Sequence, residues 1–86
     1  MTLRLREEDL EWREIDDEIV VLDGRAAAYL AVSGSGILIW NLLSERADRD
    51  TLVQALVETY GIEQIRAGDD VDAFLTALVD RGLLAS

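Results

Sequence analysis

Hydrophobic and polar residues follow two different periods along the chain, and the change falls at Ser33. Before it the pattern alternates as in half-buried β-strands, first in "LEWREI" from Leu10 and then in "EIVVLD", which ends at Asp23. The pair Asp23 and Gly24 predicts a tight hairpin turn, because such turns need positive φ. A third strand is predicted over residues 26–32, although its alanines are poor strand formers.

From Ser33 onward hydrophobic residues recur at helical spacing, and three helices are predicted. The first runs through Leu43 and is capped by Ser33 or Ser35, and the second runs from near Asp48 to Gly61. The third begins at Asp69 or Asp70 and stops at Gly82. The expected inward positions are Ile39, Trp40, Leu43, Leu52, Val53, Leu56, Val57, Tyr60, Val71, Phe74, Leu75, Leu78 and Val79.

Three strands followed by three helices predict an α+β fold of winged helix-turn-helix-like type, with a three-stranded antiparallel sheet packed on the helices. At 86 residues, with 50% hydrophobic residues and no proline, the sequence is expected to form a single domain over residues 1–86. Gly36, at the start of the first helix, is expected to permit close approach of a neighbouring element.

Composition excludes several classes of function. All eight cations are arginines, and the chain contains no histidine, lysine or cysteine, so no catalytic residues, metal site or cofactor are expected. A net charge of -10 leaves no basic stripe for nucleic acid. The segment "VSGSGIL" lacks the Asp-Ser-Leu type of motif that carrier proteins use for attachment of a prosthetic group.

Nothing in the sequence indicates a membrane segment or a secretion signal. The longest apolar run, "GILIWNLL", is too short to span a bilayer and is interrupted by Asn41. The N-terminal stretch is rich in acidic residues and does not have the pattern of a signal peptide. A cytoplasmic location without membrane contact is therefore expected.

The order and spacing of these residues resemble the family of coenzyme PQQ synthesis protein D. The resemblance covers about residues 10–84 and rests on "VVLDGRAAAYLAVSGSGILIWNLL", "LVQALVETYGI" and "DVDAFLTALVDRGLL". Val32 stands where the family favours leucine, and Ser33 where asparagine is common. The family belongs to the RiPP recognition elements, which bind the leader segments of ribosomally made precursor peptides.

The resemblance implies a non-catalytic binding module in which a leader adds as a further strand beside the third strand, facing the third helix. The peptide-binding residues expected on this basis are Ala27, Ala28, Tyr29, Leu30, Ala31, Val71, Asp72, Leu75 and Val79. The implied partners are a precursor leader peptide and a separate processing enzyme. This enzyme is the leader peptidase of a lasso peptide pathway or, alternatively, a radical SAM enzyme of PQQ synthesis or of another peptide modification.

Several features have a simpler structural interpretation. The alanines of the third strand are also explained by close packing under a helix, and the acidic N-terminal segment by solubility rather than by steering of a basic leader. Asp69, Asp70 and Asp72 are explained as helix-capping residues. Trp40 is expected in the core, whereas Trp12 is either a cover for the sheet or a contact for a partner enzyme.

Overall fold

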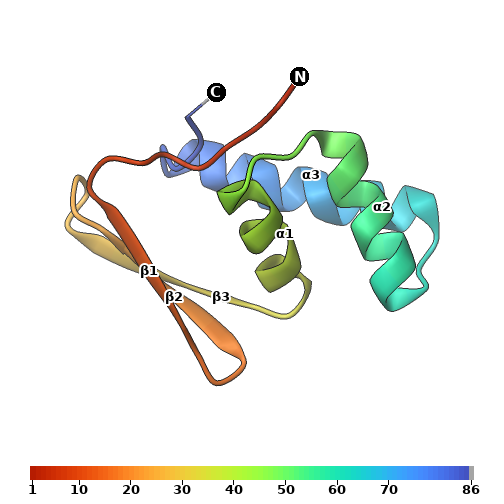
Figure 1. Cartoon of the computed structure of the whole chain (residues 1–86), viewed down its shortest axis with the longest axis horizontal. Helices are drawn as coiled ribbons and strands as arrows, with labels where there is room; N and C mark the ends of the chain where they lie inside the picture. The colour runs from red at the N-terminus through yellow and green to blue at the C-terminus, as the bar shows by residue number, and fades with distance from the viewer. Residues whose placement is uncertain (86) are drawn as a thin grey trace.

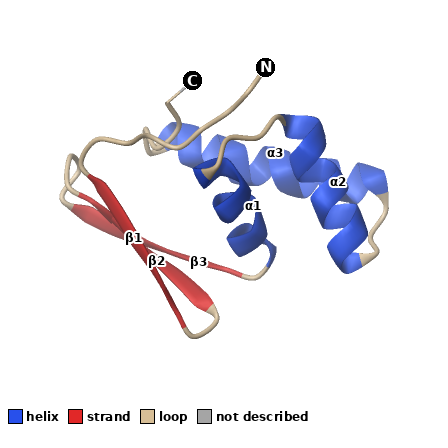
Figure 2. Ribbon diagram, in the orientation of Figure 1, coloured by secondary structure: helices blue, strands red, loops and turns tan. Residues whose placement is uncertain are grey.

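The structure, a computed structural model, describes residues 1–85. Its first three secondary-structure elements are strands that form an antiparallel sheet (Figures 1 and 2). The strands are β1 (Leu10–Ile15), β2 (Glu18–Asp23) and β3 (Ala28–Ser33), in the order β1-β2-β3. In the register, Trp12 pairs with Val21, which pairs in turn with Leu30. The predicted sheet is therefore confirmed, and β1 and β3 are its two edges.

The turn between β2 and β3 is longer than the sequence predicted. The Asp23 carboxylate accepts hydrogen bonds from the backbone N–H groups of Arg25 and Ala26, at 3.1 and 3.2 Å. These bonds hold the backbone in a turn, and Ala27 adopts a positive φ of 53°. The prediction that the third strand begins at residue 26 is wrong, because β3 begins only at Ala28.

Three helices follow the sheet: α1 (Ser35–Ser44), α2 (Arg49–Tyr60) and α3 (Gln64–Asp80). The second matches its prediction: the side chain of Asp48 accepts a hydrogen bond from the Thr51 N–H, and Gly61 ends the helix in the left-handed conformation. This hydrogen bond lowers the pKa of Asp48.

The other two helices begin differently from the prediction. The N-cap of α1 is Gly34, with φ of 61°, and no serine side chain caps the helix. The first turn of α3 starts at Gln64, five residues before the predicted Asp69. Asp69, Asp70 and Asp72 consequently lie inside α3 and do not cap it, so the capping interpretation is wrong.

The core lies where the helices meet the inner face of the sheet (Figure 1). Trp40 of α1 is fully buried, and the ring of Trp12 packs against it edge to face with centroids 5.6 Å apart. Trp12 remains 41% exposed, so it covers Trp40 from the side of the sheet. Most predicted inward positions are buried or half-buried, but Tyr60 and Val79 are exposed.

The N-terminal segment crosses the molecule and is fixed by the buried side chain of Arg6. Its guanidinium forms an ion pair with the Asp23 carboxylate at 2.5 Å and donates to the carbonyl oxygens of Glu8, Asp9 and Gly82. Arg6 thus joins the turn before β3 to the end of α3. Figure 1 shows the N-terminal segment passing close to the end of α3.

The Arg6–Asp23 ion pair makes stability dependent on pH. The hydrogen bond from Arg6 holds the pKa of Asp23 below its usual value, so the ionised carboxylate stabilises the fold above about pH 3.9. This contribution is lost as the pH falls through the lowered folded-state pKa. We expect Asp23→Asn to lower the melting temperature at pH 7 and to reduce its dependence on pH below 4, as measured by circular dichroism. The exposed Asp17→Asn variant is the control, and equal melting curves for both variants would contradict this role.

Candidate functional site

The outer edge of β3 is free to pair with another strand. No strand among residues 1–85 pairs with this side of β3. A two-residue turn joins Ile15 to Glu18, so these two residues form a hydrogen-bonded pair. In antiparallel strands the backbone groups of successive residues point to alternate sides. Followed through the register to β3, this alternation directs the backbone N–H and C=O groups of Tyr29, Ala31 and Ser33 outward, away from β2. Free groups of this kind are a template for strand addition.

Beside this edge lies a cleft with a volume of about 570 Å³, bounded by β3, the start of α1 and one face of α3. Its lining residues are Leu30, Ala31, Val32, Ser33, Ser35, Gly36, Ile39, Asp70, Ala73, Phe74, Ala77, Leu78 and Arg81. Most of these side chains are apolar or small. The cleft therefore offers an apolar wall to a chain that would pair with β3.

Gly36 borders the cleft at a point where α1 and α3 approach each other closely. A Cβ atom at this position would lie 2.8 Å from Cε1 of Phe74 and 3.0 Å from Cγ1 of Val32. Both distances are too short for an unstrained side chain. The expected close approach at Gly36 is confirmed, and it places the Phe74 ring against the end of β3.

The residues predicted on the third strand are distributed over the edge and the turn. Leu30 and Ala31 line the cleft, whereas Ala28 and Tyr29 lie on β3 but outside its lining, and Tyr29 is 72% exposed. Ala27 lies in the preceding turn and not on the strand. The structure therefore brings only part of the predicted strand surface to the cleft.

None of the residues predicted on the third helix lines the cleft. Val71 is fully buried, Leu75 packs against the core, and Val79 is 60% exposed. Asp72 accepts two hydrogen bonds from Arg49 of α2, at 2.7 and 3.0 Å. These bonds lower the pKa of Asp72 and raise that of Arg49.

The wall of the cleft is instead the face of α3 next to the predicted core stripe, and hydrophobic periodicity gave no indication of this face. The exposed side chains of Ala73 and Ala77 form its centre, four residues apart, and Asp70 and Arg81 form its ends. In the sequence, the only indication of this wall is the pair of alanines four residues apart beside the apolar stripe. Small side chains leave room for a ligand, whereas the predicted wall consisted largely of core residues.

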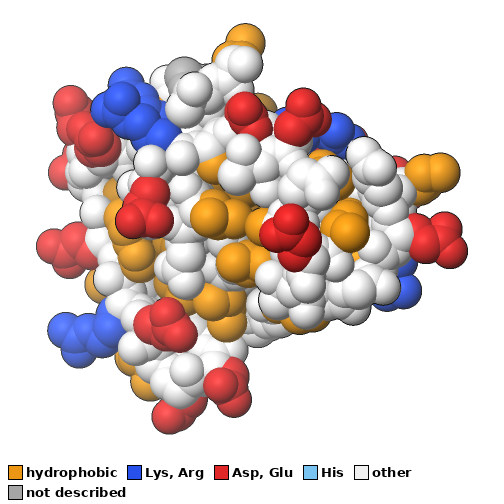
Figure 3. All heavy atoms as spheres, turned by 45° about the vertical axis from the view of Figure 1, so that its right-hand side comes forward, with side chains coloured by type: hydrophobic (Ala, Val, Ile, Leu, Met, Phe, Trp, Pro, Cys, Tyr) orange, Lys and Arg blue, Asp and Glu red, His pale blue; other side chains and the backbone are white. Residues whose placement is uncertain are grey.

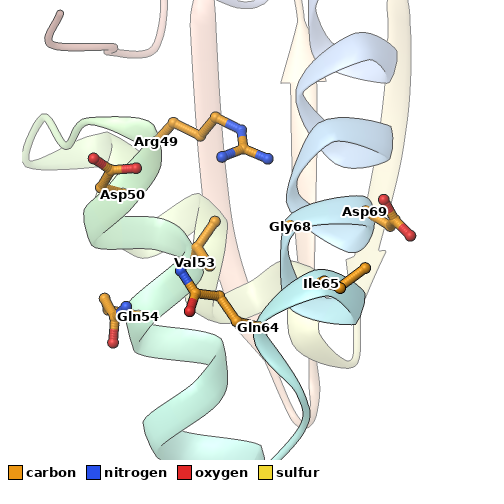
Figure 4. A pocket seen from close by; sticks show the side chains of 8 residues that line it. All are labelled: Arg49, Asp50, Val53, Gln54, Gln64, Ile65, Gly68 and Asp69. Carbon is orange, nitrogen blue, oxygen red and sulfur yellow. The ribbon is translucent and has the colours of Figure 1, made fainter.

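Two other hollows lack this combination of a strand edge and a helix. One lies between α2 and α3, and Figure 4 shows the side chains of Arg49 and Gln64 extending between the two helices. It contains no β-strand residue. The other follows β1 around Trp12 and Ile15 and contains no helical residue. Only the β3 edge, among the hollows described, combines pairing groups with an apolar helical wall.

Charge is distributed unevenly over the surface. Figure 3 shows apolar side chains exposed in the middle of one face, with separate acidic groups around them and fewer basic ones. Within residues 1–85 no cluster of side chains is suited to holding a metal ion. In the same part of the chain, no helix has both the length and the apolar character needed to cross a membrane.

Comparisons with known proteins identify one family model and two solved structures that this chain resembles. The family model described as coenzyme PQQ synthesis protein D (PqqD) matches residues 18–84. A search of curated proteins finds no significant match. Two solved structures are similar, one of TbiB1 in complex with the TbiA(beta) leader peptide and one of lasso peptide synthetase B1 complexed with the leader peptide.

The similarity to both structures extends over nearly the whole chain. The TbiB1 structure has a TM-score of 0.88 and 28% sequence identity, and the match covers 96% of this chain and 95% of that one. For the lasso peptide synthetase B1 structure the TM-score is 0.85, the identity 27% and the coverage 98% of each chain. Both structures contain a leader peptide, as their names state.

The close approach at Gly36 generates a test of the packing that forms the cleft. We expect Gly36→Leu to lower the free energy of unfolding by about 1–3 kcal/mol, because the added side chain meets Phe74 and Val32. Urea denaturation followed by tryptophan fluorescence measures this change. Asn41→Leu, at an exposed position of the same helix, is the control. A Gly36→Leu variant as stable as the parent would show that α1 and α3 can separate at no cost.

Proposed function

This chain belongs to the family of coenzyme PQQ synthesis protein D, and from this premise we propose that it binds the leader segment of a ribosomally made precursor peptide by strand addition to β3. It delivers the bound precursor to a separate processing enzyme, the leader peptidase of a lasso peptide pathway. The observation that carries the proposal is the cleft that adjoins the free edge of β3.

Strand addition supplies affinity and selectivity through different groups. The outward backbone groups of Tyr29, Ala31 and Ser33 would pair with any extended chain, whatever its sequence. Side chains that alternate along the added strand would meet the cleft on one side only, where Leu30 and Phe74 supply apolar contacts. A disordered leader becomes ordered in this process, which reduces the affinity obtained from each contact.

The lasso peptide pathway is favoured by the two similar structures. Both proteins are similar to this chain over at least 95% of their length, and one is named as a lasso peptide synthetase B1. A role as peptide chaperone for a radical SAM enzyme, in PQQ synthesis or in another peptide modification, is the second candidate. It is favoured by the family match over residues 18–84.

The proposed role is binding and not catalysis. The chain has no histidine, cysteine or lysine, so it offers neither a thiol or amine nucleophile nor an imidazole to act as an acid-base group near neutral pH. In our proposal the expected peptide-binding residues Ala28, Tyr29, Leu30 and Ala31 contribute along β3. The α3 contribution comes from the Ala73–Ala77 face rather than from Val71, Asp72, Leu75 and Val79.

Filling the cleft tests the proposed site. We expect Ala77→Trp to weaken binding of a fluorescently labelled leader peptide at least about tenfold, or ~1.4 kcal/mol, because the new ring occupies the space of the added strand. The peptide is the leader of the precursor encoded beside the gene, and fluorescence anisotropy measures the Kd. Thr76→Trp, exposed on α3 but outside the cleft lining, should leave the Kd within about twofold of the parent. Equal effects of the two substitutions, or equally tight binding of the part of the precursor that lies outside the leader, would contradict the site.

Proline substitution separates the free side of β3 from its paired side. Ala31→Pro removes an outward N–H and should abolish leader binding with a smaller loss of melting temperature, since edge strands tolerate proline at unpaired positions. Ala28→Pro removes an N–H that faces β2 and should mainly lower the melting temperature. The two variants are compared by anisotropy and by circular dichroism. Leader binding that survives Ala31→Pro in a folded protein would place the peptide elsewhere.

A further inference from the structure

The two ends of the cleft carry opposite charges, and we infer that they select a leader strand with a basic residue facing Asp70 and an acidic residue facing Arg81. This inference rests on the proposed function and specifies the peptide that the site accepts. Between the two charged residues the leader presents an apolar side chain to the cleft. The ligand is therefore an extended segment of basic, apolar and acidic residues on one face.

Asp70 and Arg81 are the two charged residues that line the cleft, and both are exposed. Neither forms an ion pair or a side-chain hydrogen bond with another residue in the described part of the chain. Asp72 and Arg49, by contrast, bind each other. The charges of Asp70 and Arg81 are thus available to a ligand.

The position of each charge along β3 follows from two contacts. Phe74 lies against Gly36, which also adjoins Val32 near the end of β3, and Asp70 precedes Phe74 by about one helical turn. At the other end, Arg6 binds both Asp23, before the start of β3, and the carbonyl of Gly82, next to Arg81. Asp70 therefore belongs to the Ser33 end of the cleft and Arg81 to the Ala28 end.

The separation of the two charges sets the spacing that the leader must have. Arg81, the C-cap of α3, follows Asp70 by eleven positions, which corresponds to about 16.5 Å at 1.5 Å per residue. An extended strand rises about 3.3 Å per residue, and only every second side chain faces the cleft. The oppositely charged leader residues should therefore stand four or six positions apart, at about 13 or 20 Å, a range that long side chains can bridge.

The centre of the cleft determines what lies between the charges. Ala73 and Ala77 leave open space on α3, and Phe74 and Leu30 are half-buried apolar side chains at its border. An apolar leader residue would cover this surface and remove it from water. The sheet is antiparallel throughout, and a fourth strand that continues this pattern places the basic leader residue nearer the leader's N-terminus.

A charge-reversal selection tests the inference. The full chain is immobilised and used to select from a displayed library of random 16-residue peptides, in parallel with Asp70→Arg, Arg81→Asp and the cleft-filled Ala77→Trp variant. Asp69→Arg and Arg66→Asp, exposed charges of α3 outside the cleft lining, are the matched controls. Circular dichroism establishes that each variant is folded.

We expect the parent to enrich peptides with a basic and an acidic residue four or six positions apart, separated by an apolar one. In a binding assay, single reversal of either peptide charge should weaken binding about three- to tenfold. Asp70→Arg should reverse the preference at the basic position alone and Arg81→Asp that at the acidic position alone. The control variants should retain the parental preference.

The outcomes separate the inference from the proposed function. The inference fails, and strand addition stands, if the parent enriches peptides that Ala77→Trp does not bind but these peptides show no charge preference. The same holds if they show a charge preference that Asp70→Arg and Arg81→Asp do not change. If the parent enriches no peptide beyond the Ala77→Trp variant, both the inference and the proposed function fail. A preference that changes equally with Asp69→Arg would reflect the overall field of the protein and overturn a role for Asp70.

Discussion

The buried guanidinium of Arg6 is the contact on which the shape of this small domain depends. It binds the Asp23 carboxylate at the turn before β3 and the Gly82 carbonyl after α3, and so joins two segments that are far apart in the sequence. A buried charge without partners would be unfavourable, so Arg6 fixes the distance between these elements in one arrangement. The start of β3 and the end of α3 together form one end of the cleft. Through Arg6 the N-terminal segment therefore positions the walls of the cleft, although none of its own side chains lines it.

The same turn explains why β3 has a free edge of limited length. Asp23 binds two backbone N–H groups after it, and Ala27 takes a positive φ, so the chain reaches strand geometry only at Ala28. At the other end, Gly34 turns the chain directly into α1. Exposed edges promote aggregation when they are long and flat. The free edge of β3 is only six residues long, and α1 and α3 lie beside it. It therefore has room for a single strand of a ligand.

Much of the fold could be predicted from the sequence, because local signals and burial agreed. The alternation in β2 matches its buried positions, and the Asp48 cap and the terminal Gly61 mark the two ends of α2 where the sequence predicts them. The start of α3 was missed because no side chain caps the helix, and because its first turns bury two small residues, Ala67 in the core and Gly68 beside Arg49 of α2, rather than large apolar ones. The start of β3 was missed because a buried arginine distant in sequence holds Asp23 in place.

The candidate site was only partly predictable, for a reason that applies to helix faces in general. Hydrophobic periodicity identifies the stripe that packs inward, and Val71 and Leu78 indeed lie in the core. A binding surface must remain outside the core, so it occupies a face rotated from that stripe, where Ala73 and Ala77 leave space instead of filling it. Their small size makes them weak signals in a single sequence. Which flank of the stripe faces β3 depends on the close approach of Phe74 to Gly36, a tertiary contact beside Val32 that no local pattern in the sequence indicates.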